Sequence, residues 1–384
     1  MRTALFALCL LGCSGDSAAP PDAALPPPPL GVDVVVASRL TGTVLRYDGS
    51  GAPAGVFCRD PLLVNPVGVT FGPDGNLYVA AGDTDRVLRF DGKTGASMGV
   101  FTSGGGFVSP RNVNFGPDGS FYVADGVQNK ILRFAPSGQF TDVFIQGPPI
   151  NGPTSFTFGP DGNVYVVSVL TSKILKFDGQ TGALAGEFVT SNLSEPHDLA
   201  FGPDGNLYVS NAENHLIQRF RGDTGAFMNT FADDPLLVTP LGLTWGPDGN
   251  LYVANQGRND VRRYDGRTGA LIDAFIAMNA QSVTLPSFLA FFPAASLTLG
   301  VGRTGALVVQ GAQPGGKILL LRGGAGGTGS VADCPATSVP LGSPAVDQTR
   351  TADESGATVV QPASGGTFVA VDVARCAASA AVTL

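Results

Sequence analysis

The chain has 384 residues, of which 43% are hydrophobic and 53 are glycine, so it is long enough for several domains and can bury an apolar core. Its formal net charge is −8 and it contains only two histidines. This charge argues against nucleic acid or an anionic lipid surface as the main partner, because both attract an excess of lysine and arginine. We therefore expect no nucleic-acid partner.

Residues 1–12, MRTALFALCLLG, have the features of an export signal, with one arginine before an apolar run that is too short for a membrane span. The next residue is Cys13, and the run from Leu10 to Cys13 resembles the lipobox of bacterial lipoproteins. That resemblance implies cleavage before Cys13 and a diacylglycerol on its sulfur, and Ser14 implies sorting to the outer membrane. We expect an exported protein at the bacterial outer membrane or cell surface, held there through a lipid anchor only.

Residues 13–32 follow as a linker, because SGDSAAPPDAALPPPPLG contains no aromatic residue and no hydrophobic periodicity. Proline- and alanine-rich segments of this kind form semi-extended tethers. The sequence therefore predicts a spacer between the lipid anchor and the folded part.

An internal repeat begins after the linker. FGPDGNLYV at position 71 returns in closely similar form at 115, 158, 201 and 245, at intervals of 44, 43, 43 and 44 residues. A repeat of this length indicates a repeat architecture. Each unit contains four short runs of β-forming residues separated by turns such as GPDG and DGKTG, which favours four antiparallel strands per unit.

The third run of the unit occurs six times, at 45, 88, 132, 175, 218 and 262. The first copy lacks its leading strand, but Pro286, Leu289 and Phe291 near the end of the repeats match that strand. We therefore expect an all-β fold, a six-bladed β-propeller over residues 33–293 closed by a C-terminal inner strand. Closure of this kind leaves no open sheet edge.

The repeat pattern PxGLTFGPDGNLYVA followed by VLRFD, with Asn214, His215 and Leu216 in the NHL positions, resembles the NHL-repeat and gluconolactonase-like six-bladed propellers. Gluconolactonase-like enzymes would imply a metal held by a glutamate, two asparagines and an aspartate. The glutamate of the first inner strand is missing here, where Ser287 and Phe288 stand. Streptogramin-lyase-like enzymes would imply seven blades and a histidine and glutamate acting together, whereas this chain has six copies and a single channel histidine.

Residues 294–384 leave the repeat pattern and contain further β-type runs, which suggests a small sandwich resembling immunoglobulin or fibronectin domains. Cys334 and Cys376 lie in this segment, and in an exported chain we expect them to form a disulfide. A further cysteine, Cys58, lies within the repeats. It aligns with Ala232 in a matching segment, so we expect that position to require only a small side chain and not a reactive thiol.

Candidate site residues are those expected at the mouth of the channel, where each inner strand begins and the loop between the second and third strands opens. A mixed-charge cluster there could bind a polar ligand, and Asp198 with Asn112 could hold calcium or another divalent metal in the channel. Alternatively, these groups satisfy loop backbone atoms. The predicted cluster is Arg111, Asn112, Asp125, His197, Asp198, Asn211 and Asn255.

Two repeated features have structural explanations. The aspartates of the GPDG turns lack the spacing of a calcium loop, so we assign them to the turns. The third strand carries a basic residue in every copy, and the aspartates at positions 48, 91, 178 and 265 favour local pairing over a nucleic-acid surface.

Regular blades without a convincing catalytic set favour a non-catalytic binding or scaffold module for a protein or glycan at the cell envelope, and we expect a monomer. The alternative is a metal-dependent hydrolase or a lyase that uses the channel-mouth cluster.

Overall fold

The computed structural model describes residues 31–102, 104–278 and 283–293, and the backbones of the strands between residues 298 and 383. The predicted signal segment, Cys13 and most of the linker lie outside these residues, and so does Cys376. Of Cys334 only the backbone is described. No helix among the described residues is long and apolar enough to cross a membrane.

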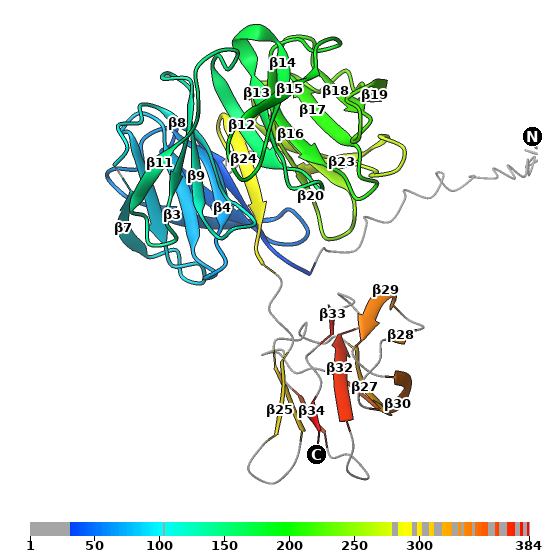
Figure 1. The fold of residues 1–384 in the computed structure, drawn as a ribbon. Helices are drawn as coiled ribbons and strands as arrows, with labels where there is room; N and C mark the ends of the chain where they lie inside the picture. The colour runs from blue at the N-terminus through cyan, green and yellow to red at the C-terminus, as the bar shows by residue number, and fades with distance from the viewer. Residues whose placement is uncertain are drawn as a thin grey trace, which may run out of the picture.

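Six four-stranded antiparallel sheets form the blades of a propeller (Figure 1). From the innermost strand outward, blade 1 consists of β24 (Pro286–Phe291), β1 (Val34–Ser38), β2 (Thr43–Tyr47) and β3 (Pro53–Arg59). Blade 2 is β4 (Pro66–Phe71), β5 (Leu77–Ala81), β6 (Arg86–Phe90) and β7 (Ser97–Thr102), and blade 3 is β8 (Pro110–Phe115), β9 (Phe121–Asp125), β10 (Lys130–Phe134) and β11 (Phe140–Gln146). Blade 4 is β12 (Pro153–Phe158), β13 (Val164–Ser168), β14 (Lys173–Phe177) and β15 (Leu184–Val189). Blade 5 is β16 (Pro196–Phe201), β17 (Leu207–Asn211), β18 (Leu216–Phe220) and β19 (Phe227–Ala232), and blade 6 is β20 (Pro240–Trp245), β21 (Leu251–Asn255), β22 (Asp260–Tyr264) and β23 (Leu271–Ile276). Short 3-10 turns, η1 (Val169–Thr171) and η2 (Gln256–Arg258), follow the second strands of blades 4 and 6.

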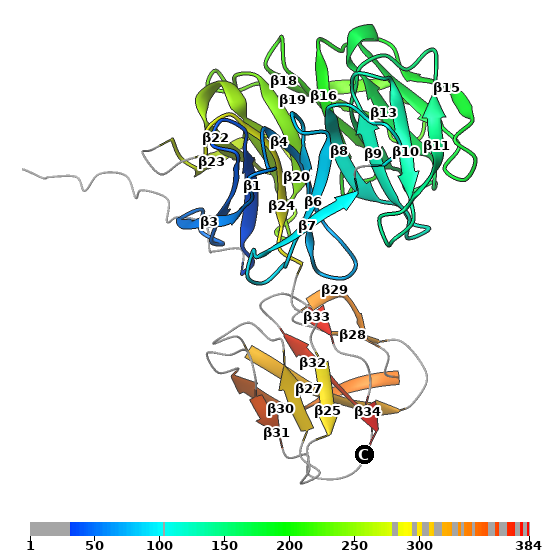
Figure 2. The same ribbon diagram turned by 90° about the vertical axis from the view of Figure 1, so that its left-hand side faces the viewer.

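The ring closes by the exchange predicted from the sequence. Strand β24 pairs with β1, so the last repeat strand is the innermost strand of the first blade, and both views place this yellow strand beside blue ones (Figures 1 and 2). The inner strands contact their neighbours all the way round, in the order β24, β4, β8, β12, β16, β20 and back to β24. The predicted six-bladed propeller is therefore confirmed.

The repeated motif joins each blade to the next. In blade 2, the hydroxyl of Tyr78 donates to Asp74 of the GPDG turn, while the Tyr78 ring packs edge-on against Phe115 of blade 3, with centroids 5.1 Å apart. A Cβ on Gly72 would lie 2.6 Å from the Tyr78 ring, so only glycine fits between the phenylalanine and proline of the motif. The same contact recurs between the following blades, in the pairs Tyr122–Phe158, Tyr165–Phe201, Tyr208–Trp245 and Tyr252–Phe291. In one of them, Trp245 takes the place of the phenylalanine.

The closing blade lacks this tyrosine, and Phe292 occupies the space instead. Its ring lies 4.9 Å from Phe71 of blade 2 and 5.2 Å from Phe57 of blade 1, and its N–H donates to the carbonyl of Asp33. The residue directly after β24 therefore packs both ends of the repeat array together.

The GPDG aspartates have the predicted turn role, since each accepts a backbone N–H two residues later and a tyrosine hydroxyl four residues later. Five of the six basic residues of the third strands pair locally, as expected, whereas Arg89 of blade 2 takes part in no ion pair among the described residues. The partners are not the predicted aspartates, because those cap their own turns. The ion pairs that form are Arg46–Asp33, Arg133–Asp142, Lys176–Asp161, Arg219–Asp204 and Arg263–Asp273.

Beyond the propeller the described strands pair in three small antiparallel sheets. These are β25 (Thr298–Val301), β26 (Leu307–Gln310) and β31 (Thr358–Val360); β27 (Lys317–Gly324), β30 (Gly342–Thr351), β32 (Thr367–Asp372), β33 (Ala377–Ala378) and β34 (Val382–Thr383); and β28 (Gly329–Val331) with β29 (Cys334–Val339). The β-rich character of this segment agrees with the sequence, while the sandwich, its boundary at 294 and the Cys334–Cys376 disulfide stay predictions.

Candidate functional site

Each inner strand begins with a bulge that directs side chains into the channel. Its first proline pairs with the end of the second strand, but the register then shifts, so that one or two residues after the proline are left without a ladder partner. Unpaired residues in a bulge are re-aimed relative to the regular strand. This irregularity explains why Arg111 and His197, each directly after a proline, line the channel mouth.

The residue before that proline has a left-handed backbone in every blade, which turns the chain from the preceding blade into the channel. In the loop that enters blade 5 this residue is Glu195, with φ of 48°. In four other loops a side chain of the preceding blade accepts the N–H of this residue. The four donor–acceptor pairs are Ser109 to Asp85, Gly152 to Asn129, Thr239 to His215 and Leu285 to Asn259.

A cavity of about 600 Å³ opens at this end of the channel, and we call it the mouth cavity. This volume lies within the range of about 300–1,000 Å³ that is usual for small-molecule sites. Its charged and titratable lining consists of Arg39, Arg111, Glu195, His197 and Glu213. Its apolar wall includes Val67, Leu170, Leu241 and Phe288.

His197 and Glu195 lie together in this cavity, with 3.7 Å between the imidazole Nε2 and a carboxylate oxygen. Burial lowers the pKa of His197, and although Glu195 opposes this shift, the charges of Arg111 and Arg39 add to it. The imidazole is therefore neutral near pH 7, which is the protonation state that a general base requires.

The two arginines differ in how they are held. The Nε of Arg39 donates to Asn65 at 2.7 Å, and burial followed by the charge of Arg111 lowers the pKa of Arg39. The side chain of Arg111 packs over Gly126, and it takes part in none of the ion pairs among the described residues. Its guanidinium is thus available to an anionic group in the mouth cavity.

Asp198 and Asn112 are not in the mouth cavity but line a second cavity of about 550 Å³ further along the channel. Asn112 donates to the hydroxyl of Ser155 at 2.6 Å, which donates to Asp198 at 2.5 Å. Asp198 also accepts the backbone N–H groups of Leu199 and Leu243, so a single carboxylate links the inner strands of blades 4, 5 and 6. Burial raises the pKa of Asp198 to about 6.

Within the described residues, no group of three or more histidine, cysteine, aspartate or glutamate side chains is arranged so that it could hold a metal ion. Both oxygens of Asp198 already accept hydrogen bonds from protein groups. The residues predicted for a metal, Asp198 and Asn112, therefore form part of a hydrogen-bonded bridge between blades.

Asp125, Asn211 and Asn255 end the second strands of their blades, are fully buried and do not line the mouth cavity. Asp125 accepts the N–H groups of Val108, Val127 and Gln128. These three side chains hold the loops around the mouth in place, which is the structural alternative that the sequence left open.

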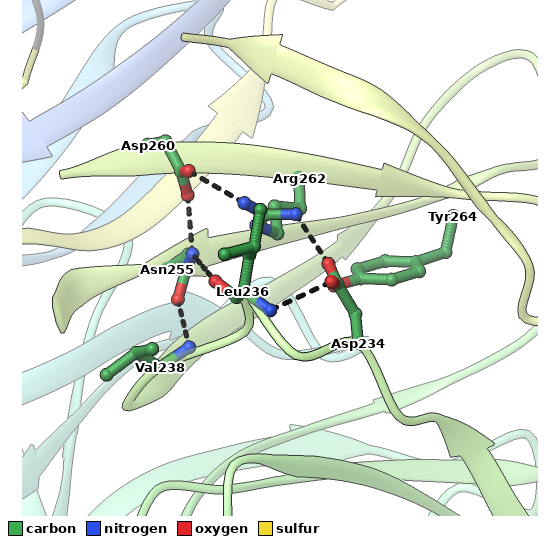
Figure 3. A network of polar contacts seen from close by, with 7 residues as sticks. All are labelled: Asp234, Leu236, Val238, Asn255, Asp260, Arg262 and Tyr264. Carbon is green, nitrogen blue, oxygen red and sulfur yellow. Dashed lines mark hydrogen bonds and ion pairs between the residues drawn. The ribbon is translucent and has the colours of Figure 1, made fainter. Parts of the chain in front are cut away.

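Asn255 belongs to a buried polar network in blade 6 (Figure 3). Its amide oxygen accepts the N–H of Val238, and its amide nitrogen donates to Leu236 and Asp260. Arg262 pairs with Asp260 and Asp234, and Figure 3 shows its guanidinium between the two carboxylates. The network fastens the loop that enters blade 6 onto the second and third strands of that blade.

Three charged residues of the mouth cavity are absent from the site predicted from the sequence: Arg39, Glu195 and Glu213. Arg39 and Glu213 follow the second strands of blades 1 and 5, one or two positions beyond the column that was compared between blades. Extending that comparison along the loops would have found both. Glu195 precedes the proline, and only its left-handed backbone brings it beside His197.

Comparison with protein families identifies the chain through its repeats. The model of the virginiamycin B lyase family matches residues 60–263, which is more than half of the chain. The chain belongs to the virginiamycin B lyase family. A comparison with curated proteins gave no match.

Solved structures similar to this family member are propellers with low sequence identity. A chain of a nidogen/laminin complex is 17% identical with a TM-score of 0.60, and the match covers 68% of this chain and 98% of that one. A protein of unknown function from Bacteroides caccae is 14% identical with a TM-score of 0.55, and the match covers 69% and 99%. At these identities the similarity shows the fold alone.

Proposed function

We propose that this protein is an envelope-anchored binding module that recognises a protein partner without catalysis, through the mouth cavity and the apolar side chains around it. The observation that carries the proposal is the distribution of exposed large apolar residues. One set, which we call the apolar rim, lies in the loops that follow the second strands and in those that lead into the inner strands, which is the end of the channel where the mouth cavity opens. It consists of Leu40, Leu62, Val64, Val108, Val127, Leu170, Leu236 and Leu285.

Leu40 and Leu170 are the most exposed members of the rim, at 72% and 71%, and Leu170 also lines the mouth cavity. Contiguous exposed apolar groups with polar groups among them are typical of protein-binding surfaces. At the opposite face, no large exposed apolar residue lies in the described GPDG turns. The exposed phenylalanines of the described residues, Phe140 and Phe227, lie on outer strands, so the rim itself contains only aliphatic side chains.

Site-specific photo-cross-linking in cells tests this proposal. A photoreactive amino acid in place of Leu40 should form an adduct with one protein partner, and Leu170→Asp should abolish the adduct. The matched control is Leu184→Asp, a substitution on outer strand β15 at a side chain that is also exposed. Equal adducts in the two variants would contradict the proposal, and an adduct destroyed by periodate but resistant to protease would indicate a glycan instead.

The proposed anchoring has a separate test. A Cys13→Ser variant should leave the membrane fraction and appear in the soluble extract, because it cannot carry the thioether-linked lipid. If it remained with the detergent-soluble membrane fraction, the lipoprotein part of the proposal would be wrong.

A second candidate function is that of a lyase, favoured by the pair of His197 and Glu195 and by the family to which the chain belongs. A neutral imidazole beside a carboxylate in a cavity is suited to removing a proton from a bound substrate. Incubation with virginiamycin B followed by mass spectrometry tests this function. A lyase product keeps the mass of the substrate while its chromatographic mobility changes, and a hydrolase product gains one water. Loss of the product in His197→Ala would assign the reaction to this pair.

A further inference from the structure

The charges of the mouth cavity are separated across the channel. Arg39 comes from blade 1 and Arg111 from blade 3, on either side of blade 2. Glu195 leads into blade 5 and Glu213 follows the second strand of blade 5. In a ring of six blades, blade 5 lies opposite blade 2. Two cationic groups therefore face two anionic groups across one cavity.

We propose that the mouth cavity binds a dipolar peptide segment, with its anionic group at Arg39 and Arg111 and its cationic group at Glu195 and Glu213. This inference rests on the proposed binding function and specifies which chemistry enters the cavity. We expect the segment between the two charges to be apolar, because Val67, Leu241 and Phe288 contribute apolar side chains to the lining of the cavity.

The hydrogen bonds of these residues leave them able to bind such a segment. Arg39 uses its Nε for Asn65, which leaves the two terminal nitrogens of its guanidinium for a carboxylate. Glu213 accepts from Ser194 through one oxygen at 2.6 Å and retains the other for a cation. Arg111, which has no ion-pair partner among the described residues, can bind a carboxylate in the bidentate manner.

The neutral state of His197 follows from the same arrangement. The imidazole lies beside Glu195 but is also exposed to the positive charges of Arg39 and Arg111, whose effect adds to that of burial. A neutral imidazole adds no positive charge beside Glu195. A cationic group of the ligand supplies that charge.

Tri-leucine is a suitable probe, since an extended tripeptide places its free amine and carboxylate about 10 Å apart with apolar side chains between. Four forms are compared by calorimetry with the full mature protein: free, N-acetylated, C-amidated and blocked at both ends. We expect the free form to bind, and blocking either end to weaken binding by about tenfold or more, since each blocked end removes charge-assisted hydrogen bonds.

Variants of the protein test which side of the cavity binds the amine of the tripeptide and which side binds its carboxylate. In Arg111→Gln the preference for the free over the C-amidated form should become smaller, and in Glu213→Gln the preference for the free over the N-acetylated form should become smaller. Arg221→Gln is the matched control, because Arg221 forms an exposed pair with Asp223 away from the cavity and should keep the full discrimination. Circular dichroism of each variant shows that the fold is retained.

The outcomes separate this inference from the function on which it rests. Equal binding of all four forms would overturn dipolar recognition while leaving ligand binding at the mouth intact. No binding of any form, with the Leu40 adduct preserved in cells, would also overturn it and leave the binding module standing. Loss of both would overturn both proposals.

Discussion

Replacing Arg262 by leucine tests how blade 6 is held together. Arg262 occupies a third-strand position where the other blades carry a leucine or a glutamine in the core. Its side chain is only 4% exposed, and it lies between Asp234 and Asp260, whose side chains are 9% and 6% exposed. The equivalent residues are Leu45, Leu88, Leu132, Leu175 and Gln218.

Arg262→Leu leaves two buried carboxylates without their cation. Asp234 keeps the hydrogen bonds from Leu236 and Tyr264, but Asp260 keeps only that from Asn255. Removing one partner of a buried ion pair typically costs about 3–5 kcal/mol, because the remaining charge stays desolvated. We expect a loss of that size in the free energy of unfolding.

A compensated variant distinguishes lost charge balance from lost packing. The triple variant R262L/D234N/D260N replaces both uncompensated carboxylates by neutral amides. Since buried ion pairs can be replaced by apolar groups at little cost, it should recover most of the loss. Arg221→Leu breaks an exposed pair and should cost less than about 1 kcal/mol.

Urea denaturation followed by tryptophan fluorescence measures these changes in the blade concerned, because Trp245, the sole tryptophan, lies on β20 of blade 6. The loss should also depend on pH. Burial raises the pKa of Asp260, while the hydrogen bond from Asn255 and the charge of Arg262 lower it, so removing Arg262 should raise this pKa further. A carboxyl with a raised folded-state pKa destabilises the fold above that pKa, and this cost disappears as the pH falls. The loss in Arg262→Leu should therefore be smaller at pH 5 than at pH 8. A cost below about 1 kcal/mol, or one independent of pH, would refute the reasoning.

Three further substitutions or reactions test other parts of the propeller. Asp198 has a folded-state pKa raised from 3.8 to about 6, so its contribution to stability should rise by about 2 kcal/mol as the pH falls from 8 to 4, and Asp198→Asn should lack this rise in urea titrations. Gly222→Ala should lower the free energy of unfolding, measured by thermal denaturation, by about 1–3 kcal/mol, because a Cβ there would lie 1.8 Å from the carbonyl oxygen of Gly205. The control Gly104→Ala should be tolerated, because its Cβ would meet only a side-chain atom at 3.7 Å. Burial raises the pKa of the Cys58 thiol, so it should resist alkylation at pH 8 in the native protein and react after denaturation, as peptide mapping would show.

The repeat pattern by itself determined the blade count, the closing strand and the turns. These follow from local chemistry: proline, aspartate and glycine specify the turn, and the tyrosine of one unit needs the aromatic residue of the next. Each copy therefore contains the contacts that stack it on its neighbour. The ion pairs of the third strands were predicted as local but assigned to the wrong aspartates, because strand register, which places Asp142 opposite Arg133 and Asp273 opposite Arg263, decides the partner.

The candidate site depended on features that lie between the repeats. Sequence comparison placed Arg111 and His197 at the channel mouth because both follow the inner-strand proline, and the structure puts them in one cavity. The sequence comparison also assigned Asp198 and Asn112 to the mouth, because each directly follows His197 or Arg111 in the chain. The structure places both further along the channel, since side chains of neighbouring residues in a bulge point in different directions. The left-handed backbone of Glu195, which sets it beside His197, became visible only in the folded ring, because the path of a loop between two blades depends on how those blades pack.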